Sequence, residues 1–189
     1  MKGLDLMIDI EEYDILKNNM KPIKETSLDD TNDIYLTEAT CPVIDFDAVK
    51  DIYKINCSLE NDAPIKSVDA CSIINDDIFF IEFKNGKINS KKKKEIREKI
   101  VYSSMILMDV LEVDLNYLRN HSNYIVVYNK DKNPESEEDD YGVSDRVFGL
   151  AGEVKQRFSI QRLEKFCYKN GHTYTPEQFD KFFIQEYLG

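Results

Sequence analysis

Two neighbouring segments near the middle of the chain combine strand-forming residues with a short polar interval. Residues 68–74 (VDACSII) and 78–83 (IFFIEF) are rich in β-branched and aromatic side chains, which favour strands. The interval between them holds only Asn and Asp, which tolerate the positive φ angles of two-residue hairpin turns. The pattern predicts an antiparallel hairpin with its turn at residues 75–76 or at residues 76–77.

Helical periodicity is strongest over residues 90–112. Ile96, Ile100 and Leu107 recur at spacings that place them on one face of a helix. We therefore expect the longest helix of the protein here. The apolar run at 123–130 (NYIVVYNK) predicts another strand after it.

Capping residues indicate where further helices begin. Asp45 or Asp47 can cap a helix within residues 41–55 (CPVIDFDAVKDIYKI). A Thr-Pro-x-Gln sequence near the C-terminus has the form of a capping box with proline at the first helical position. The remaining expected helices are residues 145–156, residues 159–170 (SIQRLEKFCYKN) stopped near Gly171, and a C-terminal helix that begins with Thr175, Pro176 and Gln178.

The chain has 189 residues, enough for one domain with a sizeable core, and no linker clearly divides it. We expect a single domain over residues 1–189 with four parts that differ in composition. These parts are an acidic N-terminal extension (1–40) that reads as loop over 20–35, a core (45–130), a mobile acidic surface loop (131–145) and a helical C-terminal part (146–189).

Composition points to a globular protein of the cytoplasm. Hydrophobic residues make up 42% of the chain and charged residues 32%. No apolar run approaches the roughly 20 residues that span a bilayer, and the acidic start does not resemble a signal peptide. The four cysteines are scattered, which suits free thiols in a reducing compartment better than disulfides or a zinc site.

Charge is distributed unevenly along the chain. The net charge is −11, yet residues 84–99 hold eight basic and two acidic side chains, so the remainder carries −17. The acidic total argues against nonspecific nucleic-acid binding, whereas the local basic patch favours contact with phosphates. Cations at the start of a helix oppose the helix dipole, so the lysine run before Glu95 suggests a function. The expected phosphate-binding residues are Lys87, Lys91, Lys92, Lys93, Lys94 and Arg97; the alternative is that they are solvated and balance the acidic remainder.

Charged side chains also occur inside the second predicted strand of the hairpin. Side chains alternate across a strand, so Glu82 and Lys84 share one face, opposite Phe83. Both two-residue turns place Asp69 on the face of Glu82 and Lys84, directly opposite one or the other. We therefore expect three charged side chains on one face of the hairpin.

Two carboxylates and a lysine placed in this way have a chemical use. Neighbouring carboxylates repel each other unless a cation joins them or one of them takes a proton. A hard divalent ion such as Mg²⁺ or Mn²⁺ accepts carboxylate oxygens and keeps waters for chemistry. A lysine beside such an ion can orient a water or neutralise developing charge, which together suits hydrolysis of a phosphodiester.

The sequence VDA, followed after an interval by EFK, resembles the D…ExK signature of the PD-(D/E)XK, restriction-endonuclease-like nuclease superfamily. The resemblance covers about residues 45–130, because a long helix and a strand follow in the order typical of that superfamily. It implies an α/β (α+β) fold with a central mixed β-sheet flanked by helices, to which this chain adds C-terminal helices. Two features depart from the pattern: Val68 replaces the usual proline, and the strand that normally precedes the Asp strand is not evident.

The same resemblance implies roles for individual residues. Asp69 and Glu82 become ligands of Mg²⁺ or Mn²⁺, the backbone carbonyl of Phe83 a further ligand, and Lys84 the catalytic lysine. The superfamily often adds a carboxylate from its first helix. Asp47 is the candidate for that carboxylate, with Glu60 behind it.

Three functions are compatible with these features. The first is a metal-dependent nuclease acting on DNA, in defence or repair. The second is a non-catalytic interaction protein of the antitoxin, immunity or inhibitor type, whose acidic surface meets a basic protein partner. The third is a subunit that binds nucleic acid and needs another chain to cut it.

The remaining aromatic and histidine residues carry weaker signals. The C-terminal aromatic residues have the spacing of core side chains or of a homodimer seam, with base stacking as the alternative. His121 and His172 are isolated in the sequence, so we expect structural or surface roles for both.

Overall fold

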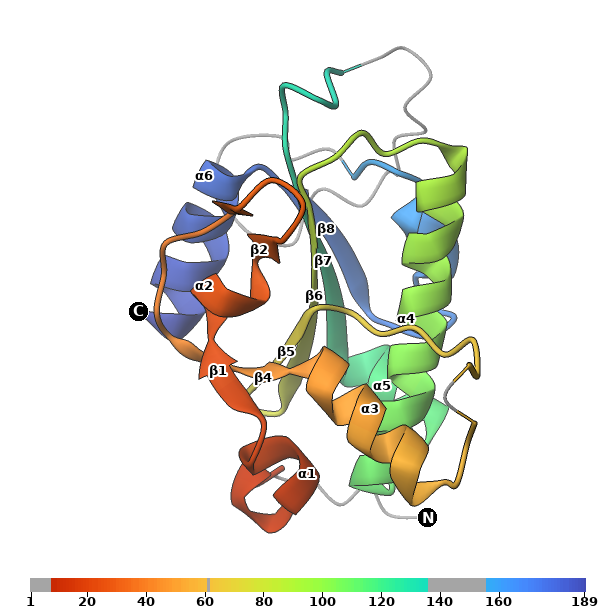
Figure 1. Cartoon of the computed structure of the whole chain (residues 1–189). Coiled ribbons are helices and arrows are strands. Elements are labelled where there is room, and N and C mark those ends of the chain that lie inside the picture. The colour runs from red at the N-terminus through yellow and green to blue at the C-terminus, as the bar shows by residue number, and fades with distance from the viewer. Residues whose placement is uncertain (1–7, 61, 136–155) are drawn as a thin grey trace.

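The computed structural model of the chain describes residues 8–60, 62–135 and 156–189, which form a mixed α/β fold (Figure 1). Its centre is a six-stranded sheet in the order β1-β4-β5-β6-β7-β8. Strands β1, β4, β5 and β6 are antiparallel to one another in turn, whereas β6, β7 and β8 are parallel. The expected mixed sheet flanked by helices is confirmed. The strands are β1 (Met20–Pro22), β4 (Pro42–Asp45), β5 (Ala70–Ile74), β6 (Asp77–Lys84), β7 (Ser122–Tyr128) and β8 (Asn170–Tyr174).

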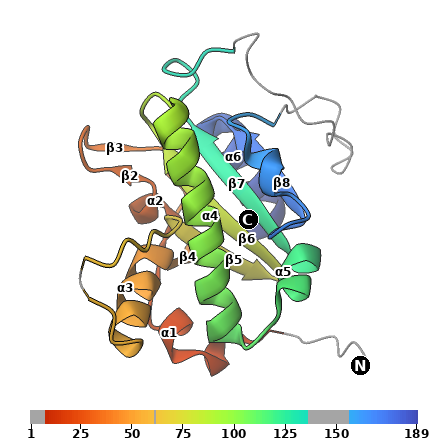
Figure 2. The ribbon, with the colours of Figure 1, turned by 90° about the vertical axis from the view of Figure 1, so that its right-hand side faces the viewer.

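One face of the sheet is covered by α4 (Ser90–Leu111), with α3 (Phe46–Asn56) and α5 (Leu115–His121) on either side of it (Figure 2). The helix predicted over residues 90–112 is confirmed to within one residue. Ile100 of α4 and Phe80 of β6 belong to the same buried cluster on this face. Because α4 and α5 together connect the end of β6 to the start of β7, these two strands run parallel.

The opposite face of the sheet is covered by α6 (Pro176–Phe179), by a π-helix that continues it (Asp180–Leu188) and by the short α2 (Ile23–Thr26). Phe183 of the π-helix is buried and packs on Phe79, with ring centroids 5.0 Å apart. The core interpretation of the C-terminal aromatic residues is therefore confirmed at this position.

The β5–β6 hairpin has the turn predicted at residues 75–76. Asn75 and Asp76 occupy it with φ angles of 48° and 69°, and Ile74 pairs with Asp77. Two successive positive φ angles match the twist of the flanking strands, which is why Asn and Asp are suited to this turn. The register sets Asp69 opposite Glu82 in the sheet, since Ala70 pairs with Ile81.

Residues 20–35, which the sequence predicts as loop, contain three short strands and one short helix. Strand β1 pairs with β4 at the edge of the main sheet, and β2 (Leu28–Asp29) and β3 (Ile34–Tyr35) form a small separate hairpin. These strands are two or three residues long, too short to show a period of two. Pairing with a neighbouring strand, rather than local pattern, makes them strands.

Residues 42–45, which the sequence predicts within the segment that starts a helix, form strand β4 instead. Its middle residues are buried on opposite faces of the sheet. Ile44 lies in the hydrophobic cluster under α4, and Val43 lies in the cluster under α6 and the π-helix. Asp45 ends the strand and caps α3, since its Oδ1 accepts a hydrogen bond of 3.2 Å from the Ala48 amide. Of the two predicted caps, Asp45 is the one used.

The C-terminal part is not wholly helical, and the helix expected over residues 159–170 is wrong. A 3₁₀ turn at Ile160–Leu163 is followed by β8, which pairs with β7. Gly171 lies inside β8, where a Cβ atom would come within 3.0 Å of Ile160 Cδ1 and 3.2 Å of Tyr168 Oη. Close packing, not a helix stop, therefore explains this glycine.

Other predictions for this region have mixed outcomes. The capping box at Thr175 and Gln178 is confirmed, with hydrogen bonds in both directions. Phe166 is one of the C-terminal aromatic residues expected in the core, and that prediction is wrong for it, because its side chain is 55% exposed. The helix expected over residues 145–156 and most of the acidic loop at 131–145 lie outside the described residues.

Two findings concern the whole described part of the chain. None of its helices has both the length and the apolar character needed to cross a membrane. All four cysteines are free thiols, as their scatter in the sequence predicted.

Candidate active site

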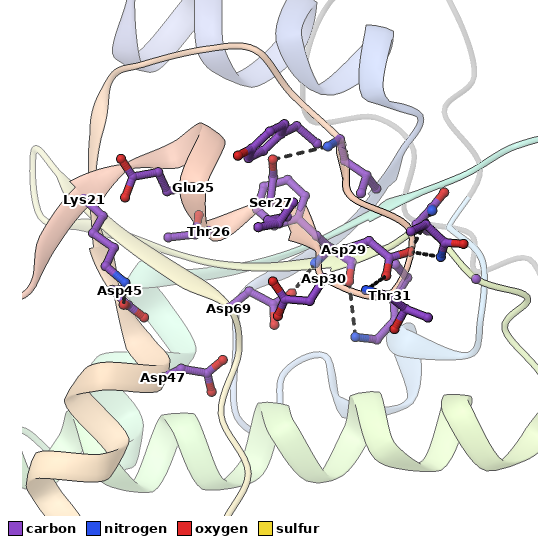
Figure 3. Close-up of a pocket in the computed structure, with 18 of the residues that line it drawn as sticks. Lys21, Glu25, Thr26, Ser27, Asp29, Asp30, Thr31, Asp45, Asp47 and Asp69 are labelled. Atoms are coloured by element: carbon purple, nitrogen blue, oxygen red, sulfur yellow. Dashed lines mark hydrogen bonds and ion pairs between the residues drawn. The ribbon is translucent and has the colours of Figure 1, made fainter.

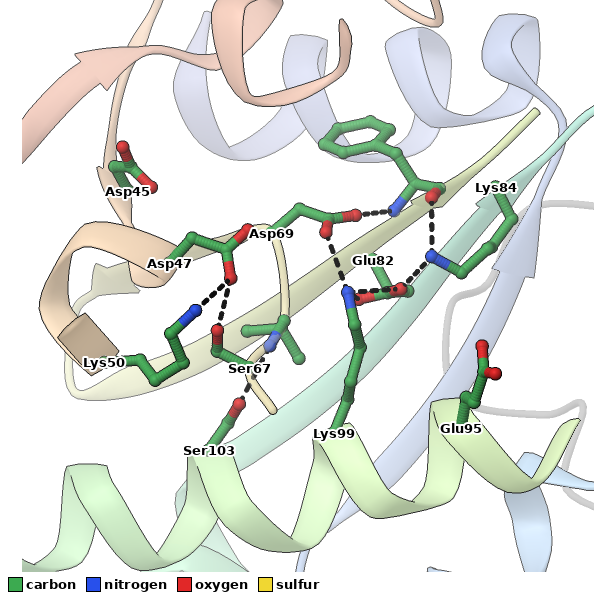
Figure 4. Close-up of polar contacts among 12 residues, drawn as sticks. Asp45, Asp47, Lys50, Ser67, Asp69, Glu82, Lys84, Glu95, Lys99 and Ser103 are labelled. Atoms are coloured by element: carbon green, nitrogen blue, oxygen red, sulfur yellow. Dashed lines mark hydrogen bonds and ion pairs between the residues drawn. The ribbon is translucent and has the colours of Figure 1, made fainter. Parts of the chain in front are cut away.

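The β5–β6 hairpin brings Asp69, Glu82 and Lys84 onto the face of the sheet that α4 covers (Figure 4). Asp69 directly precedes β5, and its amide donates a hydrogen bond of 3.1 Å to the Ile81 carbonyl. Its Oδ2 accepts a hydrogen bond of 2.6 Å from the Phe83 amide, which fixes the carboxylate against β6. The predicted convergence of the three charged side chains is confirmed, while their chemical roles remain predictions.

Lys99 of α4 joins this group, and the sequence analysis missed it. Its Nζ lies 3.0 Å from Asp69 Oδ1 and 2.9 Å from Glu82 Oε1, so one ammonium bridges the two carboxylates (Figure 4). The available signal was helical spacing. Lys99 follows the buried Ile96 by three residues and precedes the buried Ser103 by four, which places a charge on the apolar face of α4.

Lys84 approaches Glu82 from the other side. Its Nζ forms an ion pair with Glu82 Oε1 and donates a hydrogen bond of 3.2 Å to the Phe83 carbonyl. The side chain of Lys84 is 20% exposed, whereas that of Glu82 is fully buried. Lys84 therefore lies between the buried carboxylate and the surface.

The four side chains form a compact charged group, called here the quartet: Asp69, Glu82, Lys84 and Lys99. Burial raises the pKa of the Glu82 carboxyl, the Asp69 charge raises it further, and Lys84 and Lys99 oppose both effects. Burial by itself would lower the pKa of the Lys99 ammonium, but the charges of Glu82 and Asp69 outweigh it and the pKa is raised. With all four groups ionised, the quartet is electrically neutral.

A cleft of about 1040 Å³ opens beside the quartet (Figure 3). Asp69, Phe83 and Lys84 line it from the hairpin. Asp45 and Asp47 line it from the start of α3, and the β2–β3 hairpin lines the opposite side. Six carboxylate and four lysine side chains line the cleft, so it is acidic overall.

Asp47 faces this cleft but is engaged with other partners. Its Oδ1 accepts a hydrogen bond from the Ser67 hydroxyl and lies 3.3 Å from Lys50 Nζ. Glu60, the second candidate for this carboxylate, is exposed beyond the end of α3. In the parts of the chain that the structure describes, no three His, Cys, Asp or Glu side chains are grouped to hold a metal ion.

The oxygen atoms of the quartet nevertheless suit a hard divalent cation. Asp69 Oδ1 and the Glu82 carboxylate converge on one point, and the Lys99 ammonium occupies it as a cation would. The Phe83 carbonyl lies on the Lys84 side of Glu82. Carboxylate and carbonyl oxygens are the ligands that Mg²⁺ prefers. The residues present therefore fit such an ion if Lys99 moves.

Two of the six expected phosphate-binding residues line the cleft, namely Lys87 and Lys92. Lys92 also forms an ion pair of 2.7 Å with Glu95. Lys94 lies outside the cleft and pairs with Glu98 at 3.6 Å. The cleft lining does not include Lys91, Lys93 and Arg97.

The two histidines lie away from the cleft. His121 stacks on Tyr117 at a centroid distance of 4.3 Å, and His172 stacks on Tyr174 at 5.7 Å. Burial lowers the pKa of His172 to about 4, so it is neutral at physiological pH. These contacts agree with the structural roles expected for both.

No protein-family model, curated protein or solved structure matches the chain. The resemblance to the PD-(D/E)XK superfamily therefore stays an expectation from the D…ExK residues of the sequence.

Proposed function

We propose that the protein is a metal-dependent nuclease of the PD-(D/E)XK type, which hydrolyses phosphodiester bonds in DNA. One observation carries this proposal. The carboxylates of Asp69 and Glu82 share the Lys99 ammonium, whose Nζ lies 3.0 Å from Asp69 and 2.9 Å from Glu82. A second lysine, Lys84, lies beside them at the edge of a large cleft. The alternative, a hairpin with solvated surface charges, would leave its carboxylates exposed. Glu82 is instead fully buried, which costs free energy unless the charge is paired.

The chain's own residues have distinct tasks in this proposal. Asp69 and Glu82, with the Phe83 carbonyl, would hold Mg²⁺ or Mn²⁺, which supplies an activated water and Lewis-acid stabilisation. The Phe83 amide holds Asp69 in place through its hydrogen bond of 2.6 Å. Lys84 faces the cleft, where its ammonium can orient a water and stabilise the negative charge that develops on the phosphate.

The order of elements supports a restriction-endonuclease-like core. Asp69 directly precedes β5 and the Glu-x-Lys pair lies in β6. The long helix α4, the short α5 and the parallel strand β7 come next in the chain. Strand β4 pairs with β5, and we propose it as the preceding strand of that pattern, which the sequence did not reveal. Helix α3 lies between β4 and β5 in the chain, which places Asp47 at the cleft.

Charge in the cleft bears on substrate binding. Lys87 and Lys92 lie on one side and can contact phosphates, but six carboxylates also line the cleft. A divalent cation would change the quartet from neutral to positive. Metal binding and phosphate binding should therefore reinforce each other, and DNA affinity should be low when metal is removed.

A non-catalytic interaction protein on the same fold is the second candidate. The observation that favours it is that both oxygens of Glu82 already contact an ammonium. The acidic cleft and the net charge of −11 would then serve to bind a basic protein partner.

A cleavage assay separates the two candidates. Supercoiled, linear and single-stranded DNA are incubated with purified protein and Mg²⁺, Mn²⁺ or EDTA. We expect cleavage only with metal, and a loss of about 10²-fold or more in the single-turnover rate for Lys84→Ala and Glu82→Ala. Lys66→Ala removes a lysine that is paired with Glu98 outside the cleft, and it should cleave as wild type does.

Two results would count against the nuclease. Cleavage that persists in both Lys84→Ala and Glu82→Ala would indicate a contaminating enzyme. Absence of cleavage with every metal and substrate, together with nanomolar binding to a basic protein, would favour the interaction protein.

A further inference from the structure

We infer that Lys99 is a displaceable counter-ion, a positioning residue that occupies the cation position between Asp69 and Glu82 and leaves it when a divalent metal binds. This inference rests on the metal site of the proposed function. It concerns a residue of α4 that is not part of the D…ExK signature.

A metal ion can bind Glu82 only if a lysine side chain moves away from it. The Glu82 side chain has no exposed surface, and both of its oxygens contact lysine nitrogens. A metal ion cannot reach this carboxylate while both ammonium groups stay in place. One of the two lysines must therefore give up its contact before Glu82 can become a ligand.

Lys99 is better placed than Lys84 to be displaced. Its Nζ contacts both carboxylates, so it occupies the point that an ion bridging Asp69 and Glu82 would take. Lys84 contacts Glu82 and the Phe83 carbonyl instead. A metal shared by Asp69 and Glu82 thus competes with Lys99 directly and with Lys84 only in part.

The side chain of Lys99 has the freedom to move. It is 19% exposed, and a lysine has a flexible four-carbon stem that can carry its ammonium toward solvent. While it stays in place, its positive charge offsets two neighbouring carboxylates that would otherwise repel each other. Lys99 therefore holds the Asp69 and Glu82 carboxylates in place in the metal-free protein, and it raises the metal concentration needed to fill the site.

The test measures Mn²⁺ binding by isothermal titration calorimetry on wild type, Lys99→Met and Lys66→Met at one pH and ionic strength. Methionine keeps most of the length and the apolar character of the Lys99 stem but removes the competing charge. We expect Lys99→Met to bind Mn²⁺ about tenfold or more tightly, because the metal no longer displaces or faces an ammonium. Lys66→Met loses one positive charge from an ion pair of 2.6 Å with Glu98 outside the site, so its affinity should be unchanged.

Thermal melting provides a second readout. Without metal, Lys99→Met should melt at a lower temperature than wild type, because the buried Glu82 and the half-buried Asp69 lose their shared ammonium. Mn²⁺ should then raise the melting temperature of Lys99→Met more than that of wild type. A residue that only fastens α4 to the sheet would show the first effect without the second.

If Lys99→Met does not fold, Lys99→Arg tests the same idea. A guanidinium keeps the charge and can bind carboxylates through two hydrogen bonds, so it should be harder to displace and should weaken Mn²⁺ binding. Equal or tighter binding by Lys99→Arg would overturn the inference. So would unchanged or weaker binding by a folded Lys99→Met, or absence of Mn²⁺ binding in all variants.

The cleavage assay distinguishes this inference from the proposed function. Tighter Mn²⁺ binding by Lys99→Met, with no cleavage of any DNA by wild type, supports the counter-ion and rejects the nuclease. Metal-dependent cleavage by wild type, with equal Mn²⁺ affinity in wild type and Lys99→Met, supports the nuclease and rejects the counter-ion.

Discussion

Glu82 and Lys99 should be strongly coupled in the stability of the metal-free protein. Their charged atoms lie 2.9 Å apart, with Glu82 fully buried and Lys99 19% exposed. Removing one partner of a buried ion pair typically costs about 3–5 kcal/mol, because the other charge is left uncompensated. At an effective dielectric constant of about 20, unit charges about 4 Å apart attract each other by about 4 kcal/mol. Because Lys99 also pairs with Asp69, only part of this attraction is lost when Glu82 is replaced. We therefore expect a coupling energy between Glu82 and Lys99 of about 2 kcal/mol.

A double-mutant cycle measures this coupling energy. Wild type, Glu82→Gln, Lys99→Met and the double variant are unfolded with urea in EDTA, and the free energies of unfolding are compared. Each single variant should lose about 3 kcal/mol, and the double variant should lose clearly less than the sum of both. The pair Lys66 and Glu98 is the matched control, since it is also formed between a lysine and a glutamate but lies at the surface. Its coupling should be far smaller.

Additivity would refute the reasoning. If the two single losses add to the loss of the double variant within about 0.5 kcal/mol, Glu82 and Lys99 do not interact energetically. The same conclusion follows if the exposed control pair couples as strongly as the buried pair.

Three further predictions concern other parts of the structure. Burial lowers the pKa of His172 from 6.5 to about 4, so its stabilising contribution is complete above pH 6.5 and is lost as the pH falls toward 4. In urea melts, the free energy of unfolding of wild type minus that of His172→Phe should therefore shrink by up to about 3 kcal/mol between pH 7 and pH 4. A difference that stays constant over this range would contradict the prediction. Phe183→Ala should lower the free energy of unfolding by about 3–5 kcal/mol, because it removes a buried ring from the core under α6, and a loss below about 1 kcal/mol would show that the ring is not packed there. Lys92→Gln should weaken DNA binding and lower the slope of log affinity against log salt by about 1, whereas Lys94→Gln should leave the slope unchanged, because Lys92 lines the cleft and Lys94 does not. A slope for Lys92→Gln equal to that of wild type would remove Lys92 from the DNA interface.

Local sequence by itself determined the parts of the fold that have long patterns or specific turn chemistry. The helix α4 spans 22 residues, which is enough for its period to be unmistakable. The alternation of side chains along β5 and β6 placed Asp69 and Glu82 on one face, because a turn of two residues preserves that parity. The capping box at Thr175 was recognisable for the same reason, since all its partners lie within four residues.

Tertiary structure alone decided the short strands. Strands β1 and β4 have three and four residues, and each exists because a neighbour offers its backbone hydrogen-bonding groups. Residues 170–174 became β8 because they lie parallel to β7. A segment of this length has no period to read, so its conformation follows from the partner that happens to be adjacent.

For the candidate site too, some residues could be predicted from the sequence and others only from the tertiary structure. The spacing of Asp69, Glu82 and Lys84 could be read from the chain, because all three lie on one hairpin. Spacing along α4 showed only that Lys99 shares a face with apolar residues, not what that face meets. The contact with Asp69 and Glu82 arises where α4 crosses the hairpin, since a charge is stable on an apolar face only if the packed partner supplies the opposite charge.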